Sequence, residues 1–311
     1  VHDAEYYVLE RQHAEQWADD DAAVDARLAE LREANGGNPP NIVYILIDDI
    51  GFGDLGSKTL NAIRGYKTPN INEFAREGMR LARMYTEPSC TPTRVAFMTG
   101  RHPIRSGTTK VVWGMLYGMT QWEVTVAELM SDAGYTTGMF GKWHLGDHFP
   151  YRPQDRGFDE TWCIRGGATG VTADYWDNDY FDDHHFHNDK ATPSKGYSTD
   201  VFFAQGQRFI KEQVAHKKPF FAWIAPTAAH KPWICPPKYS ARYPDQNKNA
   251  AAFYGMISNI DENVGRLRAF LEELGVADNT LFIFTKVINK IKLIFIFSET
   301  IILQIIHELN L

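Results

Sequence analysis

A short apolar run near residue 45 constrains the fold more than any other feature of this sequence. Residues 42–47 are apolar without interruption and rich in β-branched side chains, and they end in Asp48 and Asp49. Such a run is typical of a strand that is buried on both faces of a parallel sheet. Three later segments have the same character, at residues 136–140, 220–225 and 281–285.

Helical patterns separate these strands. The clearest covers residues 250–274, where apolar side chains recur at spacings of three and four. Residues 70–78 and 124–133 show shorter patterns of the same kind. Strands that alternate with helices predict an α/β fold with a mostly parallel central sheet and helices on both faces. Active sites of such folds lie at the carboxyl ends of the strands, where Asp48-Asp49 and residues 142–144 fall.

The composition divides the chain into three parts. Residues 1–38 are charged and Ala-rich, and they predict an exposed helical extension that ends in a loop. Residues 39–285 carry the α/β pattern, although residues 165–200 lack periodicity and are expected to form a long loop region. Residues 286–311 are dominated by Ile, Leu, Lys and Phe and contain no Gly, Ala, Arg or Asp. This tail is a poor membrane span, and we favour a gene-model or frame error over a natural segment.

Charge and cysteine content exclude some classes of function. The net charge is −7, and no basic stripe of the kind that binds nucleic acid is present. Small anionic substrates stay possible, because the local field in a cleft matters more than net charge. The three cysteines, Cys90, Cys163 and Cys235, are widely spaced, which argues against a disulfide framework and a structural zinc site.

Residues 51–56 fit a G-x-G-x-x-G pattern after a strand, which in another context binds a dinucleotide. Three nearby carboxylates, those of Asp48, Asp49 and Asp54, would repel a diphosphate and disfavour that interpretation. Adjacent carboxylates at a strand end suit a hard cation such as calcium or magnesium. The alternative is that one aspartate caps the following turn and the other is solvated.

The loop region offers weaker signals. His184, His185 and His187 suggest a transition-metal site, but a solvated loop or the lining of a substrate pocket is the preferred interpretation. Core packing is at least as good an explanation as an aryl or sugar pocket for three tryptophans, Trp113, Trp162 and Trp176.

The most specific motif surrounds Cys90. An isolated cysteine is usually a small buried apolar residue, but Cys90 stands among polar residues, four positions before Arg94. On a helical turn Arg94 would share a face with Cys90. Cys90-x-Pro92-x-Arg94 followed by Thr99-Gly100-Arg101 resembles the signature of the type I sulfatases, part of the alkaline phosphatase superfamily. In that family the cysteine is converted to Cα-formylglycine.

Four further blocks in the family's order extend the resemblance over residues 40–285. They are Asp48-Asp49-x-Gly51-x-Gly53-Asp54, Thr68-Pro69-Asn70-Ile71, Gly141-Lys142-Trp143-His144-Leu145-Gly146 and Ala229-His230-Lys231-Pro232-Trp233. The resemblance implies arylsulfatase-like hydrolysis of a small-molecule or sugar sulfate ester, with one calcium ion (Ca2+). It also implies a formylglycine-generating enzyme as a partner during maturation, and an extracytoplasmic location, although no signal peptide is visible.

The resemblance assigns a role to each matching residue. Asp48 and Asp49 are metal ligands, together with the oxygen that Cys90 carries after modification. One hydroxyl of the formylglycine hydrate attacks sulfur to form a covalent sulfate ester, and the other then expels sulfate. By the same resemblance, Arg94 steadies the hydrate and His144 takes a proton from it. Lys142 and His230 bind sulfate oxygens, and one of the two protonates the leaving alcohol.

The chain departs from the family after Thr285. There the family has a serine followed by Asp-Asn-Gly, whose Asp and Asn complete the metal site, but here Lys286-Val287-Ile288 follows. Two carboxylates and one further oxygen are fewer than the roughly six to eight oxygens that calcium takes. The ammonium of Lys286 would also oppose a divalent cation. We therefore expect weak calcium binding and little sulfatase activity from this chain as it stands.

Two alternatives stay open. Sulfate and phosphate esters are both tetrahedral anions, so a phosphonate or phosphodiester hydrolase of the same superfamily fits the motifs as well. The missing ligands also allow an inactive, truncated fragment. Turnover of an aryl sulfate against an aryl phosphodiester tests the first alternative, and calcium affinity tests the second.

Overall fold

The computed structural model describes residues 4–51, 54–55, 58–81, 84–112, 117–171, 178–287 and 295–297. The chain divides into two compact units, Val1–Pro40 and Asn41–Leu311. In the first unit, α1 (Ala4–Ala34) is one long helix, and almost all of its described side chains are exposed. Charged residues lie around its whole circumference, which is the pattern of a solvated helix. The expected helical extension is therefore a single helix.

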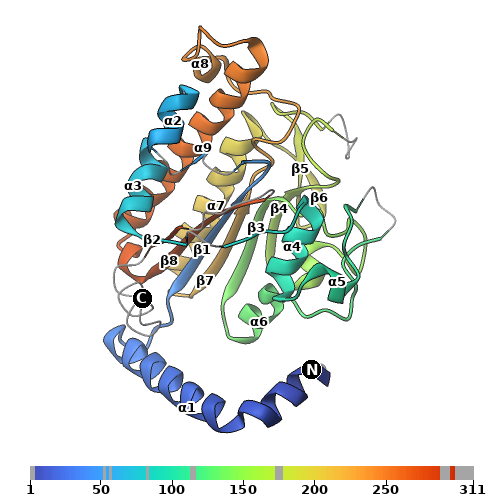
Figure 1. Cartoon of the computed structure of the whole chain (residues 1–311). Coiled ribbons are helices and arrows are strands. Elements are labelled where there is room, and N and C mark those ends of the chain that lie inside the picture. The colour runs from blue at the N-terminus through green and yellow to red at the C-terminus, as the bar shows by residue number, and fades with distance from the viewer. Residues whose placement is uncertain are drawn as a thin grey trace. The chain divides into compact units, whose positions relative to one another are not determined.

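A mixed sheet forms the centre of the second unit (Figure 1). The nine strands that the described residues form have the order β2-β9-β8-β1-β7-β3-β4-β5-β6. The parallel strands in the middle are β8 (Thr280–Lys286), β1 (Asn41–Ile47), β7 (Phe220–Ala225), β3 (Thr136–Lys142) and β4 (Glu160–Ile164). Antiparallel strands extend both edges: β9 (Phe295–Phe297) and β2 (Met79–Arg80) on one side, β5 (His184–His187) and β6 (Lys190–Pro193) on the other.

Helices cover both faces of this sheet (Figure 1). One face carries α2 (Lys58–Arg64), α3 (Pro69–Glu77), α7 (Ser198–Ala215) and α9 (Lys248–Glu273). The other carries α4 (Cys90–Thr99), α5 (Pro103–Ser106) and α6 (Val126–Asp132). Shorter helical turns complete the connections: η1 (Pro153–Arg156), α8 (Pro237–Ser240) and η2 (Ala277–Asn279).

The alternation of side chains along β1 explains why there are two apolar cores. Val43, Ile45 and Ile47 belong to the core beneath α3, α7 and α9, whereas Tyr44 and Leu46 belong to the core beneath α4. Because successive strand residues point to opposite faces, only a strand covered on both sides is apolar throughout. The predicted α/β fold, with its mostly parallel sheet and helices on both faces, is confirmed.

One sequence-based expectation about the fold needs correction. Residues 165–200 are not one loop, because β5 and β6 pair as an antiparallel hairpin within them and α7 begins at Ser198. These two strands have only four residues each and a largely polar composition, so they carry no recognisable alternation. At the chain's other end, β8 extends through Lys286, and β9 pairs with it. No helix in the described part of the chain is both long and apolar enough to cross a bilayer.

Candidate active site

The carboxyl edge of the parallel sheet gathers the residues that the motifs singled out. Asp48 and Asp49 follow β1, Lys142 is the last residue of β3, and His230 lies in the loop after β7. Cys90 is the first residue of α4. Gly141 permits the close approach of β3 to β7, because a Cβ there would lie 2.2 Å from the carbonyl oxygen of Ala225. Parallel strands end at a common edge, so residues far apart in sequence meet there.

Asp48 lies at the centre of a buried charged cluster. Its Oδ2 contacts Nζ of Lys142 and lies 3.7 Å from Nη2 of Arg94, and all three side chains are fully buried. Burial alone would raise the pKa of Asp48, but the charges of Lys142 and Arg94 hold it below its ordinary value. Arg94 Nη1 donates to the carbonyl oxygen of Lys142 over 2.5 Å. The described residues offer no hydrogen-bond partner to Asp48 Oδ1.

Asp49 and His230 face one another at the same edge. Nε2 of His230 lies 3.4 Å from Oδ2 of Asp49, and Nδ1 of His230 is 2.6 Å from the carbonyl oxygen of Lys231. A carbonyl oxygen only accepts, so Nδ1 carries a proton, and Nε2 is the ring nitrogen that faces Asp49. Burial, followed by the charge of Asp48, raises the pKa of Asp49. Asp49 Oδ1 is buried and has no partner among the described residues.

The thiol of Cys90 lies beside this pair. Its Sγ, one carboxylate oxygen of Asp49 and one ring nitrogen of His230 all lie within 4.8 Å of one another. Cys90 is 6% exposed. Burial, and then the charge of Asp48, raises the pKa of Cys90.

His144 is held in one orientation and one tautomer. Its backbone has φ of 61°, and its carbonyl oxygen accepts from Oγ1 of Thr91 over 3.2 Å. Nε2 donates to the carbonyl oxygen of Val112 over 3.0 Å, so the lone pair is on Nδ1, which is buried and has no described partner. Burial, followed by the charges of Lys142 and Arg94, lowers the pKa of His144 to about 2. The ring is therefore neutral, with an available lone pair.

Val112, Thr91 and Tyr180 have supporting positions that the sequence did not reveal. Oγ1 of Thr91 accepts from the backbone N–H of Val112 over 3.2 Å, and the hydroxyl of Tyr180 donates to the carbonyl oxygen of His230 over 3.2 Å. A backbone carbonyl carries no sequence signal, so the contact between Val112 and His144 could only be found in three dimensions. Thr91 was the easiest of the three to find from the sequence, because it lies within the Cys90 motif.

The end of β8 brings Val287, rather than Lys286, to the site. Val287 is fully buried in the same apolar cluster as Cys90, and its N–H donates to the carbonyl oxygen of Ile47 over 2.7 Å. Lys286 follows Phe284 by two positions and so lies on the opposite face of the sheet. Burial, and then the charge of Arg64, lowers the pKa of Lys286 to about 8. The expectation that the ammonium of Lys286 would repel a cation bound at Asp48 and Asp49 is therefore wrong. The residue of this segment on the face of Cys90 is Val287, whose side chain has no ligand atoms.

These residues fit a divalent cation only in part. The buried Oδ1 atoms of Asp48 and Asp49 have no hydrogen-bond partner among the described residues, and a bound cation would provide one for each. Calcium takes about six to eight oxygen ligands, and Val287 supplies none where the resemblance places an aspartate. The described donors are therefore too few for a complete calcium site.

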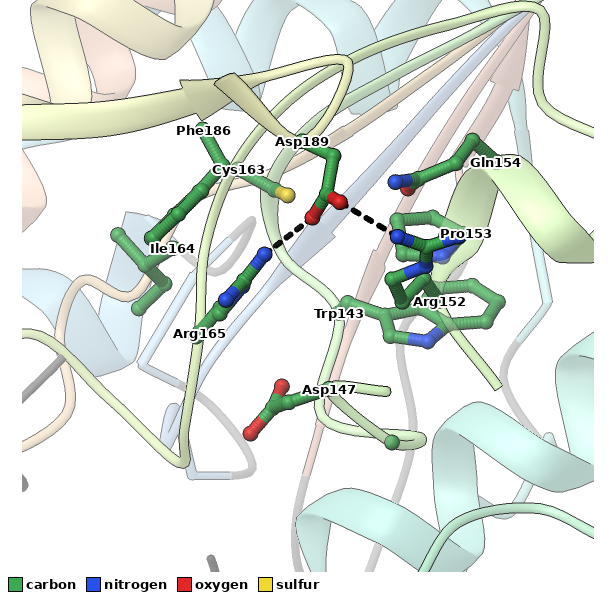
Figure 2. Close-up of a pocket in the computed structure, with 11 residues that line it drawn as sticks. Trp143, Asp147, Arg152, Pro153, Gln154, Cys163, Ile164, Arg165, Phe186 and Asp189 are labelled. Carbon is green, nitrogen blue, oxygen red and sulfur yellow. Dashed lines mark hydrogen bonds and ion pairs between the residues drawn. The ribbon is translucent and has the colours of Figure 1, made fainter. Parts of the chain in front are cut away.

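A small cavity beside the end of β4 is closed by ion pairs (Figure 2). Asp189 contacts both Arg165 and Arg152, and Arg152 also pairs with Asp155 over 2.7 Å. The volume of about 10 Å³ is barely that of one water molecule. This cavity does not hold a substrate in the conformation seen here.

The remaining sequence candidates do not join the site. His185 is buried with Nδ1 2.8 Å from Oγ of Ser194, and the described residues place none of the β5 histidines in a group of three metal-binding side chains. Trp162 packs in the core beneath α7, while Trp113 and Trp176 lie outside the described residues. Asp54 accepts from the N–H of Gly51 and contacts Arg64, a structural role within its loop.

Comparison with known proteins gives a consistent result. The family model "Sulfatase" matches residues 40–285. The N-acetylgalactosamine-6-sulfatase of Mus musculus is 32% identical over 278 residues, which cover 82% of this chain and 51% of the relative. The arylsulfatase of Klebsiella aerogenes is 28% identical over 325 residues, 85% of this chain and 69% of the relative. The chain thus spans about half the length of the first of these relatives.

Solved structures agree. The crystal structure of Ps i-CgsB in complex with k-i-k-neocarrahexaose superimposes with a TM-score of 0.73 and 29% identity, over 80% of this chain and 58% of that one. The PsFucS1 sulfatase from Pseudoalteromonas sp. gives a TM-score of 0.70 and 27% identity, over 86% of this chain and 58% of that one.

Proposed function

The chain belongs to the sulfatase family, and we propose that it forms the catalytic part of an enzyme that hydrolyses sulfate esters. The observation that carries this proposal is the convergence of Cys90, Asp49 and His230 within 4.8 Å, beside the buried cluster of Asp48, Lys142 and Arg94. Nucleophile, acid–base groups and cationic groups stand together at the strand ends, as acyl or sulfuryl transfer requires.

The proposed roles follow from chemistry at each atom. Family membership implies a metal ion and a formylglycine at position 90. A bound divalent cation would polarise a sulfate oxygen, with Asp48 and Asp49 as its ligands. The oxygen at position 90, formed by modification of Cys90, would be the nucleophile toward sulfur. Among the described residues the cation's ligand set is incomplete, so we propose the activity for a form of the protein in which further oxygens complete it.

Charged side chains of the cluster would recognise the sulfate group. Lys142 brings an ammonium whose present partner is Asp48, and His230 offers an imidazole at the open side of the site. Arg94 orients Lys142 by donating to its carbonyl oxygen. The free Nδ1 lone pair of His144 is suited to accept a proton, because Val112 already binds Nε2.

Sulfated sugars are the substrate class that we propose. The relatives named above include an N-acetylgalactosamine-6-sulfatase, and the complex named above contains a neocarrahexaose. A formylglycine-generating enzyme would act on the Cys90 motif during maturation. The family also supports an extracytoplasmic location for the protein.

Mass spectrometry of the peptide around Cys90 tests this proposal directly. Co-expression with a formylglycine-generating enzyme should convert Cys90 to formylglycine, whereas Cys163 and Cys235 stay unmodified and serve as internal controls. A form extended to the length of its relatives should then hydrolyse an aryl sulfate faster than an aryl phosphodiester. Unmodified Cys90 under these conditions, or a preference for the phosphodiester, would contradict the proposal.

A further inference from the structure

The unmodified site presents three different donor atoms to one point. In the described part of the chain, Asp49, Cys90 and His230 form the one group of three metal-binding side chains whose ligand atoms lie within 4.8 Å of one another. Nε2 of His230 faces Oδ2 of Asp49 over 3.4 Å, while Nδ1 is engaged by the carbonyl oxygen of Lys231, so Nε2 is the ring nitrogen placed to bind a metal ion. Buried polar atoms need a partner, and a cation at this point would supply one to all three side chains.

The chemistry of these donors selects a particular cation. Calcium prefers an all-oxygen shell of about six to eight ligands, and Val287 contributes no oxygen here. A thiolate, an imidazole and a carboxylate are instead ligands that zinc accepts together. Catalytic zinc sites commonly have three protein ligands and one open position, which is the number of donors present.

The distances agree with a tetrahedral centre. Zinc–nitrogen and zinc–oxygen bonds of about 2.0–2.1 Å at a tetrahedral angle place the two ligand atoms about 3.4 Å apart. The observed separation between Nε2 of His230 and Oδ2 of Asp49 is 3.4 Å. With a zinc–sulfur bond of about 2.3 Å, the Cys90 sulfur would lie about 3.6 Å from the other two ligand atoms. It lies within 4.8 Å of them here, so it would have to approach by at most about 1.2 Å.

We propose that, while Cys90 is unmodified, Asp49, Cys90 and His230 bind one zinc ion, and that conversion of Cys90 to formylglycine abolishes this site. On binding, the Cys90 thiol loses its proton to solvent and a sulfur–zinc bond forms, with no change of oxidation state. The thiolate and Asp49 together balance the two charges of the ion, while Asp48 is already balanced by Lys142 and Arg94. Maturation then replaces the one soft ligand by oxygen and turns the site toward hard cations.

Cobalt(II) is a suitable spectroscopic probe, because it occupies zinc sites and reports sulfur ligation. The chain should be made without a formylglycine-generating enzyme and without a polyhistidine tag, and mass spectrometry should establish that Cys90 is intact. Cobalt should produce a thiolate-to-metal charge-transfer band and the strong visible bands of a tetrahedral centre, and zinc should displace both. Calorimetric titration should give at least tenfold tighter binding for zinc than for calcium.

Matched variants locate the site. Cys90→Ser should lose the charge-transfer band, and His230→Gln should weaken zinc binding at least tenfold. Cys235→Ser, which removes a partly exposed thiol elsewhere, should change neither. Circular dichroism of each variant establishes that it is folded.

Three results would overturn the proposal: no charge-transfer band in the unmodified chain, a band that persists in Cys90→Ser, or tighter binding of calcium than of zinc. The first result would mean that His230 and Asp49 form a simple ion pair with a protonated imidazole. None of these results bears on formylglycine formation or aryl-sulfate turnover, which are measured on the modified protein. The zinc site and the sulfatase function can therefore fail independently.

Discussion

Lys142, the last residue of β3, places its ammonium against the carboxylate of Asp48, which follows β1, and neither side chain is accessible to solvent. We predict that Lys142→Met destabilises the fold by about 3–5 kcal/mol, because the charge of Asp48 is then buried with only Arg94 near it, at 3.7 Å. Urea denaturation at neutral pH measures this loss.

The double variant Asp48→Asn/Lys142→Met is the matched control. It removes both charges, so its loss of stability should be smaller than the sum of the two single losses, by at least about 1 kcal/mol. Simple additivity of the two substitutions would show that the buried contact does not couple the residues.

His144→Gln should remove the proposed base, Nδ1 of His144, and keep the hydrogen bond to the carbonyl oxygen of Val112. The amide nitrogen of glutamine can still donate to the carbonyl oxygen of Val112, but the side chain has no basic lone pair where Nδ1 stands. In an extended, formylglycine-bearing form, we expect aryl-sulfate turnover to fall by about 10²–10⁴-fold, with stability changed by less than about 1 kcal/mol. His144→Ala, which loses both functions, should be equally slow and less stable. Turnover of His144→Gln near that of the unsubstituted enzyme would exclude the proposed base.

Lys286→Met should stabilise the protein at neutral pH. Lys286 is 4% exposed, and its ammonium is buried and has no hydrogen-bond partner among the described residues. Burial, and then the charge of Arg64, lowers its pKa to about 8. A lysine whose pKa is lower in the folded state costs stability fully below that pKa, and the cost disappears as pH rises toward its ordinary value near 10.5. We expect a gain of about 1–2 kcal/mol at pH 7 that shrinks above pH 8. Thermal unfolding across this range measures it, and an equal gain at every pH would contradict the electrostatic cause.

Asp261 should make the contact between α3 and α9 sensitive to pH. Its carboxylate accepts from the N–H groups of Asn70 and Ile71 at the start of α3, and burial raises its pKa from 3.8 to about 6. A raised carboxyl pKa means that the folded state binds the extra proton between these values, so stability falls as pH rises from about 4 to about 6.

Comparison with Asp261→Asn isolates this effect from the other carboxylates. The stability of the unsubstituted protein relative to the variant should decline by about 1–3 kcal/mol over that interval and then stay constant. Urea denaturation at a series of pH values gives the free energy of unfolding of the unsubstituted protein and of Asp261→Asn. If the difference between the two does not change with pH, burial does not raise the pKa of Asp261.

Local sequence was sufficient for most of the fold. The apolar run of β1 and the three- and four-residue spacing in α9 depend only on which side chains are buried by neighbouring layers, so their periods are visible without any partner. The short strands β5 and β6 were missed because four-residue polar strands carry no period, and their pairing with each other and with β4 is what stabilises them.

The linear motifs by themselves determined which residues to examine, since the Cys90 segment and the blocks around Asp48, Lys142 and His230 are contiguous in sequence. Only the tertiary structure decided how they meet. Strand order put the ends of β1 and β3 on either side of β7, so that Lys142 reaches Asp48. Strand parity put Val287, and not Lys286, on the face of Cys90. A one-residue change of parity reverses the face of a side chain, and that face is set by the register of β8 against β1, which arises between segments more than 200 residues apart.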